Sequence, residues 1–352
     1  MKAIVVTPQK PGVDIREIEI QEKGEIRVMT RLSGLCGTDR GIVNGDLDFA
    51  RPPPGNDYLV LGHETLGEVV EGNDRLRKGD LVVPVVRRGC GECLNCKVGH
   101  QDFCETGKFT EIGIRGAHGT MREEFWDSEE NLVKVAPSIG EIGVLLEPLS
   151  NVVKATRELE SIQRRMLWRC EDSTYQCRTA VVLGSGPIGL LFSLTLKTMG
   201  FNVIVANRRP PSSVEEEIVK ATGSIFINTS SEQLPEMDLL VDTSGHPSAF
   251  VPLLQKIRKN GALVLFGTTG KERAEITAED VTRIVENNVV IMGSVNASKD
   301  DFQQGGNLLV TWKEMYGEVM SKFITRKVSV EEAPEVLEHK VPGEIKTVIK
   351  WK

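Results

Sequence analysis

The sequence lacks any long hydrophobic run. No segment approaches about 18 uninterrupted apolar residues, the length that a membrane-spanning helix requires, so we expect no membrane span. The opening MKAIVVTPQKPG also lacks the apolar stretch of a secretory signal peptide. Positive charge is in deficit, because 43 Lys and Arg stand against 50 Asp and Glu, for a net charge of −7. A nucleic-acid-binding surface must neutralise phosphates, so this charge balance argues against a nucleic-acid partner. The missing signal peptide and membrane span predict a cytoplasmic protein without a membrane partner.

Histidine is scarce, with five residues, and the seven cysteines are an odd number. Without a secretion signal, these thiols are predicted to be metal ligands or small buried side chains rather than disulfides. Cys170 and Cys177, outside the cysteine cluster, are expected to be buried or solvent-accessible free thiols. A chain of 352 residues with 40% hydrophobic content is long enough for about two domains with sizeable cores.

The pattern of apolar residues changes near residue 178. The first ~150 residues are rich in glycine and short β-branched runs, which predicts a mostly antiparallel β-domain with a few helices. From residue 178, apolar strand-like runs alternate with helix-length stretches, which predicts a parallel, doubly wound sheet and an α/β fold. The tail GEIKTVIKWK alternates again and is predicted to be a strand that returns to the first domain.

The segment VVLGSGPIG places Gly184, Gly186 and Gly189 as G-x-G-x-x-G between a predicted strand and a predicted helix. Glycine permits the tight turn and lets the backbone approach a pyrophosphate, whose charge then lies at the helix N-terminus. The motif alone also occurs as an ordinary glycine-rich turn, but this strand–turn–helix context favours dinucleotide binding.

The next predicted strand ends in Asn207, Arg208 and Arg209, where NAD-selective folds usually have an acidic residue. Asparagine can still bind a ribose hydroxyl, and an arginine fork suits a 2′-phosphate. We therefore expect NADP to be preferred, with NAD tolerated. A solvated basic loop is the alternative.

The stretch CGECLNCKVGHQDFC has the spacing C-x2-C-x2-C-x7-C, formed by Cys90, Cys93, Cys96 and Cys104. Bacterial iron–sulfur runs end in C-x3-C-P, whereas here the last spacer is longer and Cys104 precedes glutamate, so zinc is favoured. Four thiolates complete a tetrahedral shell and leave no place for substrate. This metal is therefore expected to be structural.

A catalytic zinc needs about three protein ligands and an open position. His63 and Cys36 each follow a strand-like run, and Glu64 is adjacent to His63. Taken singly, such residues are more often packed or surface residues than ligands. Their combination with a dinucleotide motif and a four-cysteine cluster favours the metal interpretation.

The segments GLCGTDRGIVNG, LVLGHE, CGECLNCKVGHQDFC, VVLGSGPIG and GEIKTVIKW together resemble the zinc-dependent medium-chain dehydrogenase superfamily, and within it the archaeal-type glucose 1-dehydrogenase family. The resemblance spans the whole chain. It implies a GroES-like catalytic domain over residues 1–155, with a zinc lobe at about 87–107. A Rossmann domain over residues 156–303 and a returning segment over 304–352 would follow.

For the catalytic centre, the resemblance implies that Cys36, His63 and Glu147 bind zinc, with Glu64 in the first or second shell. Thr38 would relay the proton that leaves the substrate.

The sugar would be bound by Thr38, Glu111, Glu147, Asn151 and Asn296, although Glu111 and Asn296 could also be ordinary loop and turn residues. Val86 departs from some relatives, which have asparagine there, so one sugar hydroxyl would lose a partner and epimer selectivity would differ. Cofactor contacts are expected from Gly184, Ser185, Gly186, Pro187, Ile188, Gly189, Asn207, Arg208, Arg209, Phe266, Gly267, Thr268, Ser294, Val295 and Asn296.

The implied activity is NAD(P)-dependent oxidation of D-glucose, and of D-galactose or related aldoses, at C1 to the aldonolactone. This is the reaction type of non-phosphorylative Entner–Doudoroff catabolism. Two zinc ions per chain and a homo-oligomer, dimer or tetramer, are expected. A zinc-dependent polyol or secondary-alcohol dehydrogenase is one alternative, and a non-catalytic zinc- and nucleotide-binding redox sensor is another.

Overall fold

The computed structural model describes residues 1–20, 24–267 and 272–351. The chain forms two compact units: unit 1 comprises Met1–Ser150 with Asn296–Lys352, and unit 2 is Asn151–Val295. These boundaries differ from the expected 155/156 and 303/304. Helix α3 (Leu146–Gln163) spans both the observed 150/151 boundary and the expected 155/156 boundary. Asn296 makes a hydrogen bond to a residue of unit 1, so unit 1 resumes before the expected residue 304. Within the described residues, no helix is both long enough and apolar enough to cross a membrane.

Unit 1 is built on a seven-stranded sheet, ordered β11-β6-β5-β3-β19-β18, in which β10 also pairs with β3. All its pairings are antiparallel except β18 with β19. The mainly antiparallel β-domain predicted from the sequence is confirmed. The strands are β3 (Ile26–Gly34), β5 (Glu64–Glu71), β6 (Leu81–Pro84), β10 (Glu124–Asp127), β11 (Leu132–Val135), β18 (Ile324–Val328) and β19 (Lys346–Lys350).

Two three-stranded sheets, β2-β1-β4 and β7-β8-β9, complete the strands of unit 1. They comprise β1 (Lys2–Val6), β2 (Asp14–Glu17), β4 (Leu59–Val60), β7 (Arg87–Arg88), β8 (Thr110–Ile112) and β9 (Gly116–Ala117). The α-helices are α1 (Gly37–Val43), α2 (Leu94–Lys97), α8 (Lys299–Tyr316), α9 (Glu318–Ser321) and α10 (Ala333–Glu338). Short 3₁₀ helices span Gln101–Phe103, Glu129–Asn131 and Pro137–Leu145.

The core of unit 1 follows from alternation along its strands. In β3, Ile26 and Val28 are fully buried, with half-buried residues between and after them. They pack with Val69, Val82 and Phe125 from the neighbouring strands. Burial of these apolar side chains contributes about 25 cal/mol of stabilising free energy per Å² of surface removed from water. This packing fixes the positions of the strands whose ends form the candidate site.

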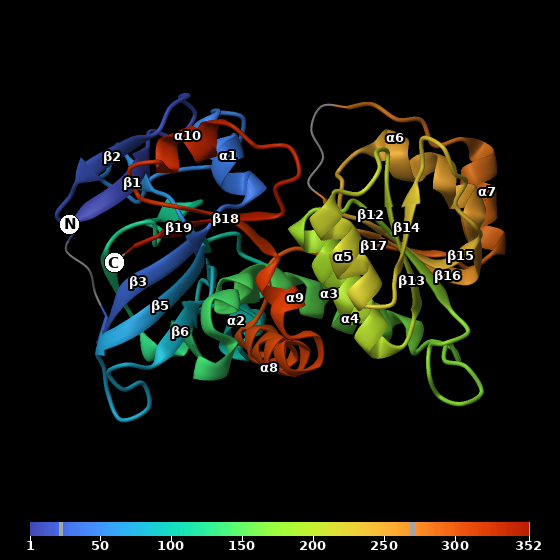
Figure 1. Cartoon of the computed structure of the whole chain (residues 1–352), viewed down its shortest axis with the longest axis horizontal. Helices are drawn as coiled ribbons and strands as arrows, with labels where there is room; N and C mark the ends of the chain where they lie inside the picture. Colours follow the sequence, from blue (N-terminus) through green and yellow to red (C-terminus); the bar gives the residue numbers. More distant parts are fainter. Residues whose placement is uncertain (21–23, 268–271, 352) are drawn as a thin grey trace. The chain divides into compact units, whose positions relative to one another are not determined.

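Unit 2 is a six-stranded parallel sheet, ordered β14-β13-β12-β15-β16-β17 (Figure 1). The doubly wound sheet predicted from alternating strands and helices is confirmed. Strands are β12 (Thr179–Leu183), β13 (Asn202–Asn207), β14 (Ile225–Asn228), β15 (Met237–Asp242), β16 (Ile257–Leu265) and β17 (Val290–Gly293). Helices are α4 (Pro187–Met199), α5 (Ser213–Ala221), α6 (Pro247–Phe250) and α7 (Ala278–Glu286), with a 3₁₀ helix at Val251–Lys256.

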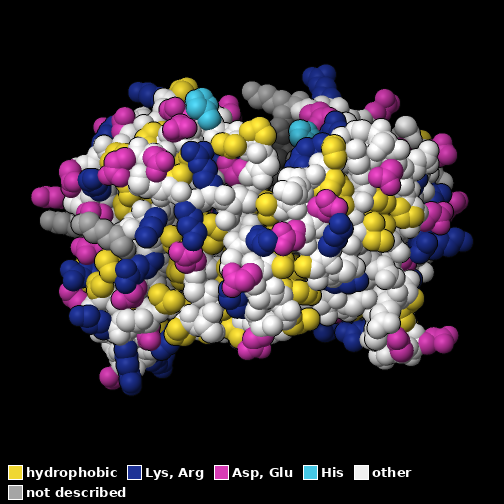
Figure 2. All heavy atoms as spheres, in the orientation of Figure 1, with side chains coloured by type: hydrophobic (Ala, Val, Ile, Leu, Met, Phe, Trp, Pro, Cys, Tyr) yellow, Lys and Arg dark blue, Asp and Glu magenta, His cyan; other side chains and the backbone are white. Residues whose placement is uncertain are grey.

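On the face of the molecule that Figure 2 shows, acidic and basic side chains are interspersed.

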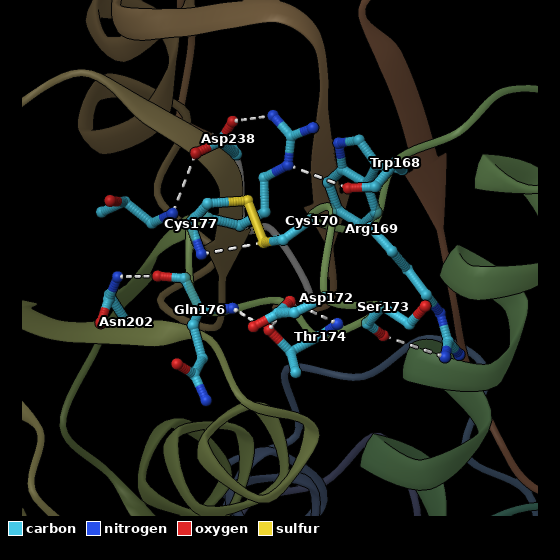
Figure 3. Close-up of a disulfide and its surroundings, with 12 residues drawn as sticks. Trp168, Arg169, Cys170, Asp172, Ser173, Thr174, Gln176, Cys177, Asn202 and Asp238 are labelled. Atoms are coloured by element: carbon cyan, nitrogen blue, oxygen red, sulfur yellow. Dashed lines mark hydrogen bonds and ion pairs between the residues drawn. A yellow bond between two sulfur atoms is a disulfide. The ribbon is translucent and has the colours of Figure 1, made fainter.

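The expectation of free thiols at Cys170 and Cys177 is wrong, because the two residues form a disulfide (Figure 3). The loop between α3 and β12 folds back on itself and brings their Cα atoms to 5.9 Å, within bonding range. The Cys177 N–H donates to Cys170 Sγ at 2.9 Å, and Tyr175 in the same loop stacks on Phe201. A cellular compartment inferred from the lack of a secretion signal does not report this local geometry. The other five cysteines are free.

Candidate active site

The first candidate metal group forms where the end of β3 meets the start of β5. Cys36 is the N-cap of α1, His63 directly precedes β5, and Glu64 is the first residue of β5, opposite Gly34 of β3. One ligand atom from each of Cys36, His63 and Glu64 lies within 4.8 Å of the other two. A Cβ at Gly34 would lie 2.5 Å from Glu64 Oε2, so this approach requires glycine. Three ligands leave a tetrahedral cation one open position.

Asp39 orients the imidazole of His63. Its Oδ2 accepts from the Cys36 backbone N–H at 2.9 Å, and its Oδ1 lies 3.4 Å from His63 Nδ1. A proton on Nδ1 that faces this buried carboxylate leaves Nε2 free to bind a metal. Burial opposes a charge on the ring, but Asp39 and Cys36 together raise the pKa of His63 well above its ordinary value. A divalent cation held by Cys36 and His63 fits these surroundings, because they favour positive charge.

Glu64 has a second partner, Lys346 of β19. Lys346 Nζ forms an ion pair with Glu64 Oε2 and donates to the Leu35 carbonyl oxygen at 3.0 Å. Both charged side chains are buried, with 1% and 2% of their surface exposed. Burial disfavours the ammonium, but Glu64, with smaller contributions from Cys36 and Glu147, raises the pKa of Lys346 above its ordinary value. Lys346 therefore ties one oxygen of Glu64 to the sheet.

Glu147 and Thr38 were expected at the same centre. Glu147 lies in the first turn of α3 and is 7% exposed, but it is not part of the three-ligand group. Its charge acts on Lys346, so it lies within electrostatic reach of the Glu64 partner. Thr38 is the second residue of α1, partly buried and two positions after Cys36.

The second candidate metal group is the zinc lobe. Its candidate ligands are the Sγ atoms of Cys90, Cys93, Cys96 and Cys104, which lie within 4.8 Å of one another. A hydrogen bond from Thr106, followed by backbone N–H donors, lowers the pKa of Cys90 to about 6, whereas burial raises the pKa of Cys96 to about 12. Four converging sulfur atoms fit a closed zinc shell, which leaves no position for substrate.

We expect Cys96→Ser to lower stability before it lowers catalysis. Loss of one thiolate should reduce bound zinc from two ions to about one per chain and lower Tm on the order of 5 °C or more. At temperatures where the variant remains folded, kcat should change little. Metal analysis and thermal melts check this. In the metal analysis, Cys170→Ser/Cys177→Ser is a control that removes two sulfurs but no candidate ligand, so it should keep two zinc ions. Unchanged Tm with lost turnover would mean that the roles of the two metal sites are reversed.

Two of the residues expected to bind sugar are in direct contact. Asn296 Nδ2 donates to Glu111 Oε1 at 2.7 Å, and Glu111 is 5% exposed. Asn296 has a φ of 61°, in the left-handed region that asparagine tolerates. Asn151 lies four residues after Glu147 in α3, and therefore on the same helical face. Val86, which stands where some relatives are expected to have asparagine, is 4% exposed.

The nucleotide motif forms the turn between β12 and α4. Gly184 has a φ of 105°, which favours glycine. A Cβ at Gly189 would lie 2.0 Å from the Gly184 carbonyl oxygen, so helix and strand can pack only with glycine there. A Cβ at Gly186, the N-cap of α4, would meet nothing within 4 Å. This open space at a 13-residue helix N-terminus fits a pyrophosphate.

The two candidate 2′-phosphate arginines differ in their partners. Arg209 donates from both Nη atoms to Glu215 at 2.7 Å, and Ser185 Oγ donates to the same carboxylate at 2.6 Å. Burial opposes ionisation of Glu215, but these hydrogen bonds lower its pKa. Arg208 is exposed, and its guanidinium makes no hydrogen bond or ion pair with any residue that the structure describes. Asn207 Nδ2 donates to Ser185 Oγ at 2.7 Å.

Arg208→Ala should therefore weaken NADP more than Arg209→Ala does. Loss of one charged contact to a 2′-phosphate corresponds to about 1.5–3 kcal/mol, so KM for NADP should rise about 10- to 100-fold. KM for NAD, which has no 2′-phosphate, should stay within about twofold, and steady-state kinetics with both cofactors measures the difference. Unchanged KM for NADP in both variants would contradict the assignment.

Among the other expected cofactor residues, Phe266 and Gly267 follow β16, and Ser294 and Val295 follow β17. The Phe266 ring packs edge-to-face on Phe192 at 5.1 Å, and Gly267 N–H donates to the Asp242 carbonyl oxygen. Ser294 Oγ donates to Glu158 at 2.5 Å, and Val295 is 58% exposed. Pro187 and Ile188 open α4. Thr268 lies outside the described residues.

Three charged residues of these sites were not among the residues predicted from the sequence: Asp39, Glu215 and Lys346. Glu215 had a readable local signal, since Ser212 and Glu215 form the S-x-x-E capping box of α5. Asp39 has a weaker one, three residues after a candidate ligand. Lys346 contacts a residue 282 positions away, for which no local pattern exists.

Two family descriptions together match nearly the whole chain. "Alcohol dehydrogenase GroES-like domain" matches residues 22–137, and "Glucose dehydrogenase C-terminus" matches residues 140–351. Glucose 1-dehydrogenase of Metallosphaera sedula is 68% identical over 353 residues, covering 100% of this chain and 99% of that protein. Glucose 1-dehydrogenase 2 of Saccharolobus solfataricus is 40% identical, with 100% of both chains covered.

Among solved structures, the fold matches Haloferax mediterranei glucose dehydrogenase in complex with NADP, Zn and gluconolactone. The TM-score is 0.88 at 29% identity, and the match covers 100% of this chain and 99% of that one.

Proposed function

The chain belongs to the archaeal-type glucose 1-dehydrogenase family of zinc-dependent medium-chain dehydrogenases, and on that premise we propose that it oxidises D-glucose at C1 to the lactone. NADP⁺ is the preferred hydride acceptor and NAD⁺ a second one. D-Galactose and related aldoses are further substrates. The sugar loses a hydride from C1 and a proton from the C1 hydroxyl.

The observation that carries this proposal is the three-ligand group of Cys36, His63 and Glu64, which leaves a coordination position open. Zinc held there supplies Lewis acidity that favours loss of the hydroxyl proton. NADP⁺ at the Gly184–Gly189 turn supplies the hydride acceptor.

The protein's own residues position the reactants. Asp39 fixes the ring of His63, and Lys346 fixes one oxygen of Glu64. Thr38 relays the departing proton towards solvent. Glu111 and Asn296 recognise sugar hydroxyls as a partly buried, hydrogen-bonded polar pair, and such sites discriminate strongly against analogues that lack a hydroxyl.

A substrate panel tests the function. Reduced cofactor formation should be measured with glucose, galactose, xylose, sorbitol and 2-butanol, using NADP⁺ and NAD⁺, before and after chelation. We expect activity on the aldoses that chelation abolishes. Activity on sorbitol and 2-butanol alone would support the alternative of a polyol or secondary-alcohol dehydrogenase. Absence of turnover together with about one zinc per chain would support the sensor.

We further propose a cytoplasmic homo-oligomer that pairs through unit 2. Strand β17 lies at one end of the strand order, and Ile291 on it is 42% exposed. On α7, Val281 and Val285 lie four residues apart, on one face, and are 52% and 69% exposed. A second copy of β17 offers both the backbone hydrogen bonds and the apolar surface to cover this edge. Light scattering should give a mass of two or four chains.

A further inference from the structure

Glu111 is held by an arginine on the adjacent strand. In the antiparallel pair of β7 and β8, Arg87 lies directly opposite Glu111, so their side chains project from the same face. Arg87 Nε and Nη2 donate to Glu111 Oε1 at 3.2 and 2.9 Å. The side chains are 11% and 7% exposed, so the pair is shielded from water.

The two carboxylate oxygens of Glu111 have different surroundings. Oε1 accepts three hydrogen bonds, two from Arg87 and one from Asn296 at 2.7 Å. Oε2 has Arg115 Nε at 3.7 Å, beyond hydrogen-bonding distance. Among the described residues, therefore, Oε1 is engaged by protein donors, whereas Oε2 retains its capacity to accept from a ligand.

Arg87 is itself immobilised on its other sides. Its Nη1 donates to the Asp102 carbonyl oxygen at 2.8 Å, and its guanidinium carbon lies 4.0 Å from the Phe109 ring centroid. The Arg115 guanidinium lies 5.1 Å from the ring centroids of both Phe109 and Phe49. Planar guanidinium groups stack favourably on aromatic rings. Arg87 is thus a rigid support rather than a mobile surface charge.

We propose that Arg87 is a positioning residue for sugar recognition, which holds Glu111 by Oε1 and presents Oε2 to one hydroxyl of the aldose. The proposal rests on the sugar-binding role given to Glu111 in the proposed function. A fixed acceptor strengthens the contact with a hydroxyl in the correct place and rejects a sugar without that hydroxyl. Arg87 acts through Glu111 and touches no reacting atom.

The test compares Arg87→Gln with Arg88→Gln, a matched control on the same strand. Arg88 is also largely buried in an ion pair, with Asp127 at 2.6 Å, but it does not contact Glu111. We expect Arg87→Gln to raise KM for glucose about 10- to 100-fold while kcat changes less than about threefold, because a substrate contact made equally in ground and transition states is lost. Arg88→Gln should leave both parameters near wild type.

Deoxy sugars separate positioning from general damage. kcat/KM should be measured for glucose and for its 2-, 3-, 4- and 6-deoxy analogues. In the wild type, removal of the hydroxyl that faces Glu111 should be strongly penalised, and in Arg87→Gln that penalty should shrink at least tenfold while the others remain. Equal loss on all sugars, with unchanged deoxy ratios, would overturn the proposal and indicate a structural role for Arg87.

Glu111→Gln distinguishes this failure from failure of the proposed function. If Glu111→Gln leaves every deoxy ratio unchanged, the sugar-binding role of Glu111 is wrong. If Glu111→Gln removes one penalty and Arg87→Gln does not, only the role of Arg87 is wrong. Two zinc ions per chain in each variant show that the lobe beside Asp102 is intact. Should Arg87→Gln not fold, Phe109→Leu, which removes the ring against the guanidinium, should reduce the same penalty, and no reduction would overturn the proposal.

Discussion

His63→Ala should lower turnover of glucose roughly a thousandfold or more, because it removes a ligand from the three-residue group that leaves a coordination position open. A Lewis acid at this position contributes several kcal/mol to transition-state stabilisation, and about 4 kcal/mol corresponds to three orders of magnitude in rate. The remaining pair, Cys36 and Glu64, has too few donors to retain the metal firmly. Bound zinc should therefore fall from two ions to about one per chain.

Two companion variants sharpen this experiment. Asp39→Asn retains a side chain of the same shape against His63 but removes its charge, so activity or zinc affinity should fall only about 10- to 100-fold. His118→Ala removes another histidine of unit 1, one that stacks on Tyr58 and accepts from the Val60 N–H, and it should keep both zinc ions. Metal analysis and single-turnover kinetics supply the readouts. Two zinc ions in His63→Ala would contradict the assignment of this centre.

The features that the sequence predicts correctly depend on neighbouring residues. The apolar runs from Thr179 onward identify the parallel sheet because fully buried strands must be apolar on both faces. The turn at Gly184–Gly189 is readable because Gly184 and Gly189 each satisfy a local steric requirement, while Gly186 leaves open space at the helix N-terminus. The cysteines of the zinc lobe converge within a short segment, so their spacing alone restricts how they can meet.

The features that the sequence does not predict depend on pairs of residues, far apart in the sequence, that only the tertiary fold brings together. Asn296 reaches Glu111 across 185 positions, and Lys346 reaches Glu64 across 282. No local sequence pattern, neither a periodicity nor a motif spacing, links the two residues of either pair. The choice between Glu64 and Glu147 as third ligand shows the same limit. The resemblance favours Glu147, whereas the meeting of β3 with β5 places Glu64 with Cys36 and His63.

Lys346→Met should destabilise the protein by about 3–5 kcal/mol, because it leaves the carboxylate of Glu64 buried without its cation. Methionine retains the length and apolar stem of lysine, so packing changes little and the loss is chiefly electrostatic. The Leu35 carbonyl oxygen also loses its Lys346 donor. Urea unfolding of the full chain, followed by tryptophan fluorescence, measures the change in free energy.

A surface pair provides the matched control for this substitution. Lys327 on β18 pairs with Glu141, and their side chains are 48% and 52% exposed. Water solvates the glutamate that Lys327→Met leaves behind, so this variant should lose less than about 1 kcal/mol. Equal losses in Lys327→Met and Lys346→Met would show that burial does not strengthen the dependence of Glu64 on Lys346.

The double variant Glu64→Gln/Lys346→Met separates the ion pair from other effects of the lysine. Removing both charges leaves no uncompensated buried ion, so most of the stability lost in Lys346→Met should return. Zinc should modulate the same loss, since a cation at Cys36 and His63 gives Glu64 a second source of positive charge. The destabilisation by Lys346→Met should therefore be larger when wild type and variant are compared after chelation than when both hold zinc. A loss of the same size in both states would mean that Glu64 gains nothing from the metal, and that it belongs to the sheet rather than to the catalytic centre.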